Sequence, residues 1–63
     1  MMNIYVVLVT PEASRGKVSQ EGYLSLAAAK DFIESHRPKP KQLDLYHFRD
    51  EDYTEYEIVP VKV

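Results

Sequence analysis

The chain has 63 residues, a formal net charge of −2 and no cysteine. At this length a single hydrophobic core barely offsets the conformational entropy lost on folding, and the cysteine count excludes disulfides and thiolate zinc sites as further sources of stability. Hydrophobic residues make up 44% and charged residues 29%, a composition typical of folded proteins. We therefore expect one small domain over residues 1–63, stabilised in part by oligomerisation.

The first predicted strand covers residues 3–10, NIYVVLVT. Its apolar run is too short for a membrane helix or a secretory signal, and no basic residue precedes it. Together with the lack of cysteine, this favours a cytoplasmic chain without a membrane segment. Both alternating sets of its side chains are apolar, so both faces of the strand need cover. One set is Ile4, Val6 and Leu8, and the other is Tyr5, Val7 and Val9.

Residues 11–17, PEASRGK, are expected to form a hairpin loop, because they combine a proline with a glycine. A second strand is predicted from about residue 17 to residue 24. Gly22 weakens that strand, so we expect it to be short or bulged.

A helix of about eleven residues is predicted to start after Ser25, which is a good N-cap. Its end is expected near Arg37, because Pro38 disfavours the helical conformation of the residue before it. An apolar stripe at helical spacing marks the face that packs on a sheet. The stripe consists of Leu26, Ala29, Phe32, Ile33 and His36.

A third strand is predicted over residues 42–49, a solvated acidic turn at DEDYT, and a last strand over residues 55–63. Pro60 within the last strand indicates a β-bulge or an edge position. The expected fold is a small two-layer α+β sandwich. It has one roughly four-stranded sheet with a single helix on one face, in the order β-β-α-β-β.

One short helix can cover only one face of such a sheet. We predict that Tyr5, Val7 and Val9 lie on the opposite face and form the interface of a homodimer, since a contiguous apolar patch marks an interaction site. An unknown protein partner and plain exposure to solvent are the alternatives.

Residues able to carry chemistry are few. The two histidines, His36 and His47, have no thiol to act with, and each serine has a simpler role in a loop, strand or cap. His47 with Asp50 and Asp52 lacks the ligand count of a zinc site, and the acidic turn lacks the spacing of a calcium loop. We predict no catalytic residue, no metal and no cofactor, and hence a non-enzymatic interaction module.

The charges are unevenly distributed along the chain. Residues 50–57 carry five carboxylates, a local charge of −5, so the remainder sums to +3. Within that remainder Arg37, Lys39 and Lys41 could contact phosphates in the segment 36–41, which defines the alternative of a nucleic-acid-binding module. The acidic turn would repel a polyanion, and self-association is the preferred prediction.

Overall fold

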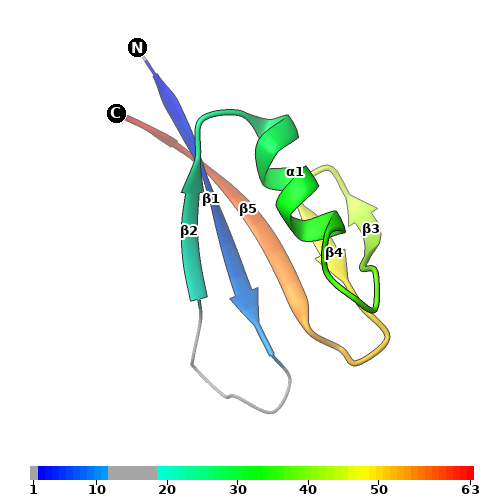
Figure 1. Ribbon diagram of the computed structural model, residues 1–63. Helices are drawn as coiled ribbons and strands as arrows, with labels where there is room; N and C mark the ends of the chain where they lie inside the picture. Colours follow the sequence, from blue (N-terminus) through cyan, green and yellow to red (C-terminus); the bar gives the residue numbers. More distant parts are fainter. Residues whose placement is uncertain (1, 12–18) are drawn as a thin grey trace.

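The computed structural model describes residues 2–11 and 19–63. They form one five-stranded antiparallel sheet in the order β2-β1-β5-β4-β3, with the helix α1 lying across one face (Figure 1). The elements are β1 (Asn3–Thr10), β2 (Ser19–Tyr23), α1 (Leu26–Glu34), β3 (Lys41–Asp44), β4 (His47–Arg49) and β5 (Glu55–Lys62).

The α+β class is confirmed, whereas the count of four strands and the order β-β-α-β-β are wrong. The predicted strand over residues 42–49 is divided into β3 and β4 by a tight turn. Asp44 closes this turn, because its Oδ1 accepts a hydrogen bond of 2.9 Å from the backbone N–H of Tyr46. The register of β3 against β4 also shifts between Gln42 and Asp44. The loop predicted at residues 11–17 lies, apart from its first residue, outside the described residues.

The start of α1 follows the prediction, since Ser25 Oγ accepts a hydrogen bond of 3.1 Å from the N–H of Ala28. The helix ends at Glu34, a few residues before the predicted end near Arg37. Ser35 Oγ donates to the Phe32 carbonyl at 2.6 Å, and His36 Nδ1 lies 3.0 Å from the same oxygen. These local bonds satisfy the last helical carbonyls before the proline is reached.

β1 and β5 pair over eight residues without a register shift, from Asn3 opposite Lys62 to Thr10 opposite Glu55. The predicted bulge at Pro60 is therefore absent, and the alternative of an edge position is wrong for β5, which lies between β1 and β4 at the centre of the sheet. The N–H of Ile58 points toward β4 and donates to the Tyr46 carbonyl at 2.8 Å. Two residues further on, the nitrogen of Pro60 points the same way but lies beyond the last residue that β4 pairs.

The core lies between α1 and the sheet, and the predicted placement of Tyr5, Val7 and Val9 on the opposite face is wrong. Val7 is fully buried, and Tyr5 and Val9 pack against the same cluster. The register puts Val7 beside Ile58 and Val9 beside Tyr56, and these partners line the helix face. The buried apolar residues are Val7, Ala29, Ile33, Phe48, Tyr56 and Ile58.

The turn between β4 and β5 depends on Asp50, which is only 9% exposed. Its Oδ1 accepts hydrogen bonds of 2.9 Å from the N–H of Asp52 and 3.0 Å from that of Thr54. Burial, followed by the negative charge of Asp50, raises the pKa of the Tyr56 hydroxyl. Asp50 is thus a structural carboxylate, contrary to the expectation of a merely solvated turn.

We predict that Asp50→Ala lowers the free energy of unfolding by about 1–3 kcal/mol, because two partly buried backbone hydrogen bonds lose their acceptor. Asp50→Asn should cost less, since its amide oxygen can accept the same bonds. The control Glu51→Gln, an exposed neighbour, should stay within about 0.5 kcal/mol. Urea denaturation followed by circular dichroism measures all three. Equal stability of Asp50→Ala and Glu51→Gln would contradict the assigned role.

Candidate functional site

The sheet face opposite α1, called the open face below, is apolar near the chain termini and polar at the other end. Because opposed residues of an antiparallel pair share a face, the register assigns its side chains directly. From the termini onward the pairs on β1 and β5 are Ile4 with Val61, Val6 with Val59, Leu8 with Glu57, and Thr10 with Glu55. We name Ile4, Val6, Leu8, Val59 and Val61 the apolar patch.

Gly22 on β2 adds no side chain over the outer side of the apolar patch, in which Val61 is exposed and the other four residues are partly buried. It stands opposite Val6 and has no side chain to lay over it. A Cβ at this position would lie 3.2 Å from Ile4 Cγ2, which is a tight contact. The glycine that weakens β2 in the sequence thus keeps this part of the open face flat.

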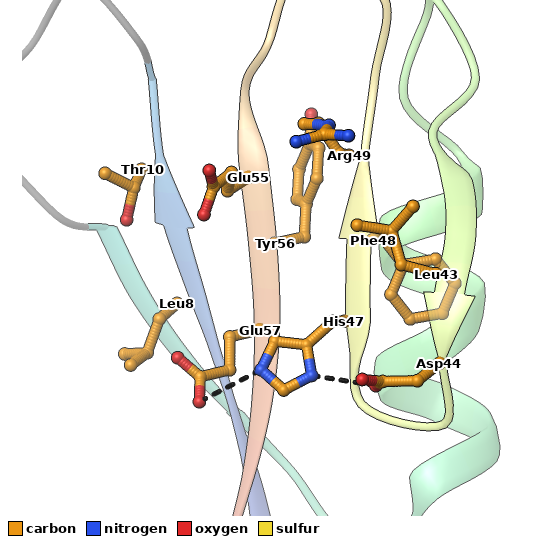
Figure 2. Close-up of a pocket in the computed structure, with 10 residues that line it drawn as sticks. All are labelled: Leu8, Thr10, Leu43, Asp44, His47, Phe48, Arg49, Glu55, Tyr56 and Glu57. Carbon is orange, nitrogen blue, oxygen red and sulfur yellow. Dashed lines mark hydrogen bonds and ion pairs between the residues drawn. The ribbon is translucent and has the colours of Figure 1, made fainter.

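The polar end of the open face is organised around His47 on β4 (Figure 2). Its Nδ1 lies 2.7 Å from Asp44 Oδ1, at the end of β3, and its Nε2 lies 3.6 Å from Glu57 Oε2 on β5. We call Asp44, His47 and Glu57 the histidine clamp, since the imidazole connects three neighbouring strands. All three side chains are about half exposed.

The clamp shifts the pKa values of His47 and Asp44 in opposite directions. The side-chain hydrogen bond to Asp44 is the main cause that raises the pKa of His47 above its ordinary 6.5, and the charges of Asp44 and Glu57 add to it. The same hydrogen bond, with the N–H of Tyr46, lowers the pKa of Asp44 from 3.8. Both shifts favour the charged pair.

A groove of about 300 Å³ runs along this end of the open face. Thr10 is the aliphatic hydroxyl in its lining, and it lies on β1, separated from His47 on β4 by the whole width of β5. Among the residues that the structure describes, the groove therefore places no aliphatic hydroxyl beside the imidazole. Within residues 2–11 and 19–63, no group of three or more His, Asp or Glu side chains is arranged to hold a metal ion.

The basic residues singled out in the sequence are only partly brought together. Lys39 and Lys41 line a second groove of about 240 Å³, where Arg49 joins them from β4. Arg37 serves the end of the helix instead, because its Nη1 donates to the carbonyls of Glu34 at 3.1 Å and of His36 at 2.8 Å. Two carboxylates, those of Asp50 and Glu51, also line the second groove.

No protein-family model, no curated protein and no solved structure matches the chain. In the part of the chain that the structure describes, no helix is long and apolar enough to cross a membrane.

We predict a specific pH dependence of stability from the histidine clamp. A raised pKa means that the contribution of His47 is fully present below pH 6.5 and is lost as the pH rises through the raised value. The lowered pKa of Asp44 means that its contribution is present above 3.8 and is lost as the pH falls through the lowered value. Both contributions to stability are therefore complete between pH 3.8 and pH 6.5.

The measurement is urea denaturation at about pH 6 and about pH 8, where the wild type should lose stability with rising pH. His47→Gln removes the titrating ring and Asp44→Asn removes the negative charge that the ring faces, so each variant should flatten this dependence. An unchanged loss of stability in both variants would show that the clamp does not carry it.

Proposed function

We propose that this chain is a small non-catalytic interaction module that forms a two-fold homodimer through the apolar patch on its open face. The observation that carries the proposal is the set of apolar cross-strand pairs, Ile4 with Val61 and Val6 with Val59, on a sheet face that no helix of the described residues covers. Contiguous apolar surface of this kind marks interaction sites on soluble proteins. The lack of cysteine supports a cytoplasmic location.

The small core supports a second copy of the chain as the occupant. Among the described residues six apolar side chains are buried, in a chain of 63 residues. A domain of this size gains stability when folding is coupled to association. A standard interface needs about 800 Å² from each partner. That is roughly a sixth of the 4591 Å² exposed by one chain.

The charge distribution also suits self-association. On the open face, the described positions of β1 and β2 are uncharged: Ile4, Val6, Leu8, Thr10, Gln20 and Gly22. In a two-fold interface the same surface meets itself, so a charged centre would repel its own copy. Here the charged side chains, including Glu55 and Glu57 on β5, lie at the end of the face away from the chain termini, at one border of the patch.

The proposal predicts that one lysine within the patch weakens dimerisation at least about tenfold, because a charge is then buried without a partner. Val6→Lys tests the centre, and Val61→Lys tests a position that is 40% exposed and tolerates a polar side chain in the fold. The matched control is Gln42→Lys on β3, which adds the same charge at an exposed site beside Phe48, on the helix side of the sheet.

Sedimentation equilibrium up to about 100 μM measures the dissociation constants, and circular dichroism verifies that each variant is folded. A wild type that stays monomeric at that concentration would refute self-association. Equal weakening by Gln42→Lys would show that the effect is one of overall charge.

A second candidate function is contact with nucleic acid through Lys39, Lys41 and Arg49, since the structure adds Arg49 to the predicted basic pair. Binding of this kind should fall steeply with salt, because phosphate contacts release counterions. A mobility shift of labelled single-stranded DNA or RNA at low ionic strength, lost in Lys41→Ala and at higher salt, would support it. An unshifted probe at low salt would remove this candidate.

A further inference from the structure

The histidine clamp borders the apolar patch through one residue, Glu57. It is the cross-strand neighbour of Leu8 on β1 and of His47 on β4. Its carboxylate therefore stands where the patch ends and the groove begins, as Figure 2 shows for Leu8, Glu57 and His47. A change of charge on the histidine clamp therefore changes the electrostatic potential at the rim of the surface that the proposed dimer buries.

The charged groups that face His47 come from three strands. Asp44 belongs to β3, Arg49 to β4, and Glu55 and Glu57 to β5, while β1 supplies the uncharged Leu8 and Thr10. Three carboxylates and one guanidinium sum to −2 when the imidazole is neutral. Protonation of His47 reduces the sum to −1. The groups that line the groove are therefore net acidic in both states, and more strongly so at higher pH. Lys41, opposite Arg49 on β3, stands on the same face but outside this lining.

We propose that protonation of His47 strengthens self-association through the apolar patch, so that the dimer is controlled by pH. This inference rests on the proposed function. In a two-fold dimer each protomer carries the same acidic rim at the border of the contact. The repulsion between the two rims scales with the product of their charges, which falls from 4 to 1, or about fourfold at any fixed separation, when both imidazoles are protonated.

The clamp geometry places this switch in an accessible pH range. The hydrogen bond to Asp44, joined by the charges of Asp44 and Glu57, raises the pKa of His47 above its ordinary 6.5. The ring is also half exposed and can exchange protons without unfolding of the sheet. His36, the other histidine, lies against Phe32 and Tyr56 on the helix face and is remote from the rim.

The test measures the dimer dissociation constant by sedimentation equilibrium at about pH 6 and about pH 8, at one low ionic strength. For the wild type we expect a constant at least about threefold smaller at the lower pH. His47→Gln should give the weaker value at both pH values, and His47→Arg the tighter value at both. His36→Gln, the matched control, should keep the pH dependence, and added salt should reduce it.

Two outcomes separate this inference from the proposed function. A wild type that dimerises equally well at both pH values, or a His47→Gln variant that retains the full dependence, overturns the switch and leaves the dimer intact. A chain that is monomeric at both pH values, with Val6→Lys indistinguishable from wild type, overturns the dimer and the switch together.

Discussion

The pairing of β1 with β5 is the contact on which the rest of the structure depends. It joins the first and last strands in register from Asn3 opposite Lys62 onward, so forming it closes almost the whole chain into one loop. β2 is attached to the sheet through β1, and β3 and β4 are attached through β5. Each of these hairpins alone would be marginal in water, and the central pair makes them one sheet.

The register of this pair also sorts the side chains between the two faces. A slip by one residue would exchange the two sets, and β1 itself offers little resistance because both of its sets are apolar. The sequence of β5 favours one register over the other, since Glu55 and Glu57 alternate with Tyr56 and Ile58. Placing the carboxylates against α1 would bury unpaired charge, so the polarity of the last strand selects the face that the first strand turns to the helix.

The same alternation gives the open face its division into an apolar and a charged half. Along β5 the outward side chains run from Val61 and Val59 to Glu57 and Glu55, so the character of the face changes within one strand. His47 stands beside the first carboxylate of the charged half. The apolar patch and His47 thus lie on the same face of the sheet. Glu57 is adjacent to both.

Local signals in the sequence were sufficient for the helix and for much of the strand content. Ser25 caps α1 as predicted, and Ala29 and Ile33 from its apolar stripe are buried. Pro60 instead lies on the central strand, where β5 extends past the last residue that β4 pairs. The cap and the stripe depend on residues within a few positions of one another, where capping and helical periodicity act directly.

The sequence by itself determined the α+β class, the helix and its buried stripe, because these follow from short-range backbone and side-chain preferences. The tertiary structure alone decided that Val7 faces the helix, that Asp50 is buried on backbone donors, and that His47 lies between Asp44 and Glu57. His47 and Glu57 are ten positions apart and become neighbours only through the register of β4 on β5. Strand neighbours are chosen by the summed burial of every pair in the sheet, a quantity that no single segment of the sequence contains.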